Sequence, residues 1–194
     1  MNKETNTKPR KRLIVLSSPS GGGKSTLAKH LMKLYPHLMF SVSATTRKQR
    51  EGEVDKEDYY FLSRKEFLKK ICDEELVEYE EIFGNIYGTL KSEIKRVLKV
   101  GDSMLFDVDV KGALSLKKHF PDDTLLIFIY PPSLEELERR LVSRSTETKE
   151  EINNRLLRAE EEMGFKGEFD ELVENDNLQH AFETIKKVTK KYQI

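Results

Sequence analysis

The chain has 194 residues, a length that suits one compact domain or a core with inserted flaps. Its 34 lysines and arginines balance its 34 aspartates and glutamates, which excludes the net positive field that draws proteins to nucleic acid or to a membrane surface. The single cysteine, Cys72, excludes an intramolecular disulfide framework and a cysteine-based zinc cluster. No apolar run approaches the roughly 20 residues of a membrane helix, so we expect a soluble protein of the reducing cytoplasm.

The first part of the chain predicts a strand, a glycine loop and a helix. Residues 1–12 are polar and basic and bury too little to offset ordering entropy, so we expect a disordered leader. Residues 13–16 form a continuous aliphatic run, typical of a strand buried on both faces. Beyond the glycines, leucines recur at helical spacing from Lys24 until Pro36.

The loop itself reads SPSGGGKS from residue 18, which matches the phosphate-binding pattern G-x-x-x-x-G-K-[ST] except that Ser18 replaces the first glycine. Such a loop turns its N–H groups around an anion, and the helix behind it adds its positive end. An ordinary glycine-rich turn would not explain the Lys24-Ser25 pair, which we expect to contact the β- and γ-phosphates and to hold Mg²⁺, respectively. The residues expected to bind ATP here are Ser20, Gly21, Gly22, Gly23, Lys24, Ser25 and Thr26.

Alternating helix and strand patterns then continue along the chain. They fall at residues 92–100, 104–109, 112–119 and 124–130. This alternation predicts an α/β fold of the P-loop NTPase type, in which helices flank a parallel sheet. Asp107 and Asp109 end one strand, where a carboxylate could reach the magnesium shell through water, meet a bound nucleotide or cap the next helix. We favour function for Asp107.

Two stretches depart from the alternation. Residues 37–89 show short apolar and polar bursts, which indicate an inserted, mostly antiparallel subdomain with a helix near residues 65–71. Residues 133–163 read as highly charged helix with leucines on one face, and we interpret them as a helical lid. A strand at 171–174 and a helix at 178–191 complete the chain. We therefore divide it into a leader (1–12), a core (13–36, 90–130 and 164–194), a subdomain (37–89) and a lid (131–163).

Several motifs beyond the loop occur in a recognisable order. They read SVSATTRKQREGE from residue 41, DYYF from 58, GNIYGT from 84, LFDVD from 105, PPS from 131, RLVSRSTET from 140 and INNRL from 152, with FD at 169 and ND at 175. Together with the loop they closely resemble the guanylate kinase family, from residue 13 to about residue 190. In that family a small residue commonly replaces the loop's first glycine, as Ser18 does here.

The resemblance implies that the 37–89 subdomain binds GMP. The residues that would bind GMP are Ser43, Arg47, Arg50, Glu53, Tyr59, Glu78, Tyr87, Thr89 and Asp107. Arg47, Arg50 and the two tyrosines would grip its phosphate, for which arginine forks and hydroxyl donors are suited. Ser43, Glu78 and Thr89 would read its base, since one carboxylate can accept from both N1–H and N2–H₂ of guanine. Adenine would leave that carboxylate unpaired.

The resemblance also implies a mechanism. Arg140, Arg144 and Arg155 match the family's lid arginines and would act with Lys24 as the catalytic set. Asn175 would lie near the adenine of ATP, although an Asn-Asp pair is also a good helix cap. No histidine base is needed, because the attacking oxygen of GMP is largely anionic at neutral pH. We expect flap and lid to close, which keeps water from competing as the acceptor.

The sequence therefore predicts transfer of the γ-phosphoryl group of ATP to GMP, and to dGMP, with Mg²⁺. One alternative is a guanylate-kinase-like module that binds proteins without catalysis, although the intact Gly23-Lys24-Ser25 argues against it. Another is a P-loop kinase for a different phosphorylated acceptor. The sequence leaves the oligomeric state open.

Overall fold

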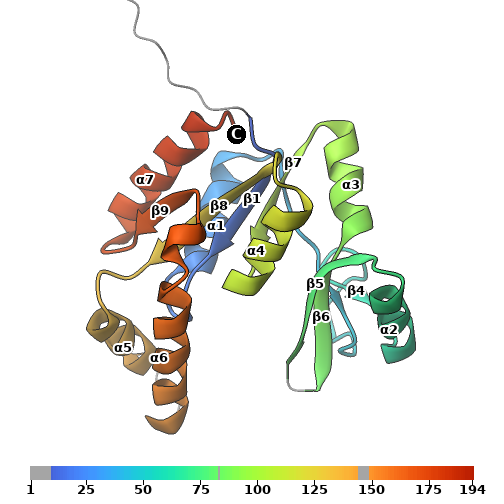
Figure 1. The fold of residues 1–194 in the computed structure, drawn as a ribbon, viewed down its shortest axis with the longest axis horizontal. Helices are drawn as coiled ribbons and strands as arrows, with labels where there is room; N and C mark the ends of the chain where they lie inside the picture. The colour runs from blue at the N-terminus through green and yellow to red at the C-terminus, as the bar shows by residue number, and fades with distance from the viewer. Residues whose placement is uncertain (1–9, 83, 144–148) are drawn as a thin grey trace, which may run out of the picture.

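A computed structural model describes residues 10–82, 84–143 and 149–194, and its core is a five-stranded parallel sheet (Figure 1). The strands are, in spatial order, β2 (Leu38–Phe40), β7 (Ser103–Asp107), β1 (Leu13–Ser17), β8 (Thr124–Tyr130) and β9 (Glu171–Glu174). Every neighbouring pair in this sheet is parallel. The predicted α/β fold with a parallel central sheet is confirmed.

Helices cover both faces of this sheet. They are α1 (Lys24–Leu34) and α7 (Leu178–Lys191) on one face, and α3 (Lys91–Val100) and α4 (Val110–His119) on the other. Alternate residues of β1 point to opposite faces, so Ile14 packs in the cluster with α1 and α7, while Val15 packs in the cluster with α3 and α4. This double burial explains why β1 and β8 read as continuous aliphatic runs.

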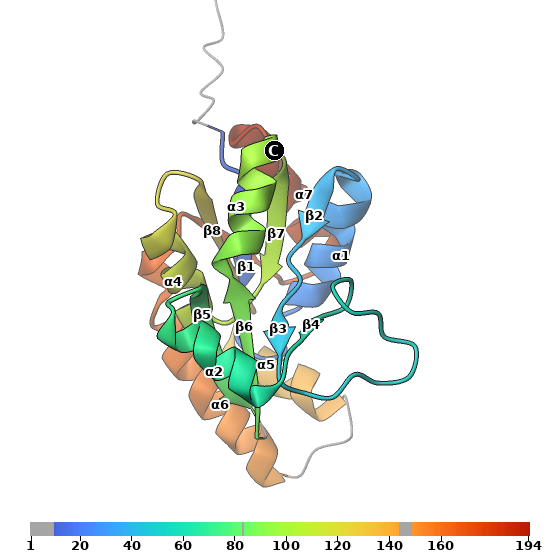
Figure 2. The same ribbon diagram turned by 90° about the vertical axis from the view of Figure 1, so that its right-hand side faces the viewer.

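A second, mixed sheet forms a smaller unit below the core (Figure 2). Its spatial order is β4 (Tyr60–Phe61), β3 (Ala44–Thr45), β6 (Asn85–Leu90) and β5 (Leu76–Ile82), with α2 (Arg64–Cys72) packed against it. Two of its three pairings are antiparallel, as predicted. The predicted boundary at residue 37 is wrong, because β2 pairs with β7 and so belongs to the core sheet.

The lid is a pair of helices, α5 (Leu134–Ser143) and α6 (Lys149–Met163), rather than one helix through residues 133–163. Leu137 and Leu141 of α5 pack against Ala159 of α6, with Ile152 and Leu156 at the edge of the cluster. Each helix has one apolar stripe, and two helices can bury their stripes only by folding against each other. A short 3₁₀ turn, η1 (Lys166–Glu168), leads back to β9.

Helix ends in the structure carry the expected caps. Asp109 caps α4, because its Oδ1 accepts the N–H of Gly112 at 2.8 Å. Asn177, the last residue of the Asn-Asp-Asn run, caps α7 by accepting the N–H of His180 at 2.8 Å. None of the helices in the described ranges is both long and apolar enough to span a bilayer.

The small sheet depends on Phe67, which lies fully buried between α2 and the strands, whereas its neighbour Leu68 is 45% exposed. We expect Phe67→Ala to lower the free energy of unfolding by about 3–5 kcal/mol, since it removes a ring from a closed cluster. Leu68→Ala is the matched control. Urea denaturation of both variants measures the difference, and equal midpoints would contradict this packing.

Candidate active site

The loop after β1 turns around a cavity of about 500 Å³. Gly21 and Gly23 have φ angles of +91° and +95°, a region that glycine enters without steric cost. The N–H of Gly22 donates to the carbonyl of Pro19 at 2.9 Å, so this donor is used within the loop. Gly22 does not line the cavity. The other residues predicted to bind ATP on this loop do line it, namely Ser20, Gly21, Gly23, Lys24, Ser25 and Thr26.

Asn175 braces this loop from the end of β9. Its side chain is almost fully buried, and its Nδ2 donates to the carbonyl of Gly22 at 2.8 Å. A side chain at Gly23 would meet the same Nδ2 atom at 2.2 Å. Asn175 does not cap α7, and its bond to Gly22 instead holds the backbone of the loop.

Asp107, at the end of β7, contacts both Lys24 and Ser25 of the loop. Its Oδ1 lies 2.9 Å from the Lys24 Nζ, and its Oδ2 accepts the Ser25 hydroxyl at 3.0 Å. The Lys24 ammonium also donates to the carbonyl of Val108 at 2.8 Å. The structure thus brings together the lysine, hydroxyl and carboxylate that the loop motif and the strand end predicted.

The predicted phosphate-binding residues of the subdomain gather around Glu53. Its carboxylate accepts two bonds from the Arg47 guanidinium, at 2.6 and 3.0 Å, and one from the N–H of Arg50 at 2.7 Å. These bonds hold the pKa of Glu53 below its usual value. The Tyr59 ring lies 5.2 Å from that guanidinium and 6.1 Å from the Tyr87 ring. Glu53, predicted to bind GMP, in this structure orients the arginine loop.

The residues predicted to read the base occupy two places, and Glu78 and Thr89 do not line the cavity that Ser43 lines. Ser43 lines a cavity of about 330 Å³ together with Tyr59 and Asp107. Thr89, which is 2% exposed, donates its hydroxyl to Oε1 of Glu78 at 2.6 Å. Burial raises the pKa of Glu78, and the bond from Thr89 opposes that shift. A carboxylate with raised pKa in a partly buried position is typical of a binding site.

The structure describes two of the three predicted lid arginines. Arg155 lines the loop cavity. Arg140 instead borders a cavity of about 370 Å³ with Asn175, and it donates to the Asn175 carbonyl at 2.9 Å and to Glu136 at 3.0 Å. Arg144 lies outside the described residues.

Two residues of the loop cavity were missed by the sequence reasoning, namely Arg158 and Glu162 of α6. Arg158 donates to Glu162 at 3.0 Å and to Oδ2 of Asp109 at 3.3 Å. Helical spacing carried the signal, because Arg158 stands three positions after Arg155 and four before Glu162, and residues so spaced share one face. Burial raises the pKa of Glu162, which Arg158 partly offsets.

A model of the guanylate kinase family matches residues 10–192 of the chain. The chain belongs to the guanylate kinase family. Guanylate kinases of Chlorobaculum tepidum and Bacteroides fragilis are 53% and 41% identical to it, over 90% and 91% of this chain and 89% of each relative. The crystal structure of guanylate kinase from Anaplasma phagocytophilum matches with a TM-score of 0.70 and 32% identity, covering 97% of this chain and 89% of that one.

The loop geometry of this guanylate kinase family member gives a testable consequence at Gly23. We expect Gly23→Ala to cost at least about 1–2 kcal/mol of stability from the left-handed φ alone, and to weaken ATP binding by displacing Asn175. Gly167→Ala, in a place where an added carbon meets nothing within 4 Å, is the control. Denaturation and calorimetric ATP titration measure both effects, and unchanged ATP affinity in Gly23→Ala would argue against the brace.

Proposed function

We propose that this protein is a guanylate kinase that transfers the γ-phosphoryl group of ATP to GMP and releases ADP and GDP. The observation that carries the proposal is the position of Asp107, which lines both the loop cavity and the cavity formed by Ser43 and Tyr59. One strand end thereby joins a triphosphate site to an acceptor site. Phosphoryl transfer requires this adjacency, because the acceptor oxygen must reach the γ-phosphate directly.

On the ATP side, the loop N–H groups and Lys24 are proposed to bind the β- and γ-phosphates. The Lys24 ammonium exchanges its present partners, Asp107 and the Val108 carbonyl, for phosphate oxygens. Arg155, which lines the same cavity, adds positive charge from the lid, and the predicted Arg140 and Arg144 complete the lid set. Asn175 and Arg140 border the neighbouring cavity, which we assign to the adenosine part.

Mg²⁺ is the ion that this chemistry implies. In the described ranges, no group of three or more His, Cys, Asp or Glu side chains could hold a metal, which fits an ion bound mostly by substrate phosphates and water. The Ser25 hydroxyl and the Asp107 carboxylate offer the oxygen donors that Mg²⁺ prefers. When bound, the ion neutralises charge on the phosphates.

On the acceptor side, Arg47 and Arg50 are proposed to bind the GMP phosphate, with hydroxyls from Tyr59 and Tyr87. The Glu53 carboxylate holds Arg47 ready for this role. The acceptor oxygen needs no base at neutral pH, because it is already largely ionised. Closure of the subdomain and lid around GMP excludes water as a competing acceptor.

Glu78 is proposed to select guanine by accepting N1–H and N2–H₂, with Thr89 and Ser43 beside it. GMP and dGMP carry the same base, and these residues are proposed to read the base, so we propose dGMP as a second acceptor. The exposed, free thiol of Cys72 suits the reducing cytoplasm, where we propose that the reaction takes place.

An acceptor assay with purified protein tests the function. GMP and dGMP are expected to be phosphorylated, and AMP, UMP and ribose 5-phosphate are not. Turnover of another acceptor with none on guanine nucleotides would make the protein a different P-loop kinase. Absence of any transfer with retained GMP binding would favour a binding module.

The role of Lys24 is tested by Lys24→Met. We expect a loss of about 100- to 1,000-fold in kcat, which is the usual effect of removing one charged donor from a developing negative charge. Lys33→Met, on the exposed side of the same helix, is the control. Activity that survived Lys24→Met nearly intact would contradict the proposed phosphate site.

The raised pKa of Glu78 predicts an acid limb for GMP use. As pH falls toward that pKa, the carboxyl takes up a proton and can no longer accept both guanine donors, so kcat/KM for GMP declines at a higher pH than an ordinary glutamate would give. We expect Glu78→Gln to lose this component, to keep only the limb from protonation of the GMP phosphate, and to be at least about 100-fold weaker throughout. A pH profile of Glu78→Gln with the wild-type acid limb would contradict the assignment.

A further inference from the structure

Arg158 occupies a position where three parts of the molecule meet. It belongs to lid helix α6, and it lines both the loop cavity and a second cavity of about 420 Å³. Asp109 of the core and Glu162 of the lid line both cavities as well. Arg158 and its partners thus form the wall between these two spaces.

The existing contacts of Arg158 join the lid to the core. Its guanidinium donates to Glu162 on its own helix and to Asp109, the residue that caps α4. The side chain remains 54% exposed, so the contact with Asp109 leaves much of the guanidinium open to another partner. An arginine fork carries five N–H donors, more than these two bonds use.

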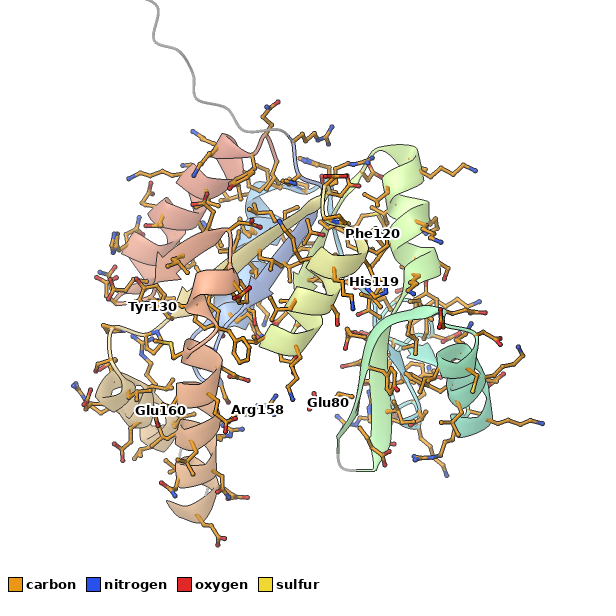
Figure 3. The ribbon with its side chains drawn as sticks, in the orientation of Figure 1. Glu80, His119, Phe120, Tyr130, Arg158 and Glu160 are labelled. Carbon is orange, nitrogen blue, oxygen red and sulfur yellow. The ribbon has the colours of Figure 1, made fainter. Side chains whose placement is uncertain are left out.

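The open side of Arg158 faces the small sheet. Glu80 of β5 lines the same 420 Å³ cavity, and Figure 3 shows Glu80 and Arg158 approaching each other from opposite sides of the gap below α4. Burial lowers the pKa of Arg158. The negative charges of Glu162, Glu80 and Asp109 outweigh this effect, so the pKa is raised. The Glu80 carboxylate is therefore already within electrostatic reach.

Strand alternation places Glu80 on the side of β5 that faces the lid. Side chains two positions apart share a face, so Glu80 points to the same side of β5 as Glu78, toward the core and lid. Glu81 points to the opposite side, where it pairs with Arg64 of α2 at 3.1 Å. On this side of β5, Glu78 is therefore available to the guanine base and Glu80 to the lid.

We propose that Arg158 is a positioning residue that latches the lid to the GMP-binding subdomain by pairing with Glu80 when the two close around substrates. The latch adds stability to the closed state alone, so it couples GMP binding to the placement of Arg155, one turn earlier on α6. The inference rests on the proposed reaction, but it concerns a contact between the lid and the subdomain and not the transfer step.

A double-mutant cycle tests the latch, using Glu80→Gln, Arg158→Gln and the two together, with Glu81→Gln as the matched control. We expect each single change at the latch to raise KM for GMP about two- to fivefold, the range of an exposed ion pair. In Glu80→Gln, which lies outside the loop cavity, KM for ATP and the melting temperature should stay near their wild-type values. KM for GMP in the double variant should be no higher than in the single variant with the higher KM. High salt should remove the difference in KM between these variants and the wild type.

A charge reversal keeps the test decisive. Glu80→Arg should raise KM for GMP more than Glu80→Gln does, because it faces the Arg158 guanidinium, and adding Arg158→Gln should remove this excess. Effects that multiply in the cycle, or no excess from Glu80→Arg, in a wild-type enzyme that phosphorylates GMP would overturn the latch alone. A wild-type protein that phosphorylates no guanine nucleotide would instead overturn the proposed function, and the latch with it.

Discussion

Parallel pairing brings the carboxyl ends of the core strands to one edge of the sheet, and each part of the proposed site begins at that edge. β1 continues into the phosphate loop, β7 ends at Asp107, and β9 ends beside Asn175. Hydrogen bonding fixes the register, so that Leu16 lies opposite Asp107, and the loop and its carboxylate partner therefore meet without further adjustment. β2 ends at the same edge, which is where the chain leaves the core to form the smaller sheet. Ligands of open α/β sheets bind at such an edge for this reason.

A site for two polyanions in a chain with zero formal net charge requires local arrangement of cations. In this structure those cations are held by carboxylates, as in Lys24 with Asp107 and Arg47 with Glu53. A paired cation keeps its position at little electrostatic cost, and it can exchange a carboxylate for a phosphate oxygen when substrate arrives. Arg158 follows the same rule, since Asp109 and Glu162 hold it in place. In the proposed site, a substrate phosphate would replace a carboxylate as the partner of each of these cations.

The sequence predicted most of the fold because its signals are local. The aliphatic run of β8 and the leucine spacing of α1 report burial directly, and the structure confirms both elements. The assignment of β2 to the core sheet was missed, since three residues carry no periodicity and their pairing with β7 spans distant parts of the chain. The brace from Asn175 to Gly22 joins residues 153 positions apart, which no local pattern encodes. Residue types predicted the candidate site, and long-range pairing arranges those residues in space.

The separation of the hydrophobic clusters is compatible with the proposed closure around substrates. The small sheet packs around Phe67, and the lid packs around Leu137 and Leu141, each in a cluster distinct from those of the core. The strand β5 joins the two kinds of surface, because Val77 packs in the core cluster with α4, whereas the gap beyond it is faced by charged Glu80. Apolar contact at Val77 thus anchors this end of β5 to the core. Charged side chains across the gap can be solvated or paired at small cost in free energy. We therefore expect the substrates and the ion pairs to supply the free energy of the proposed closure.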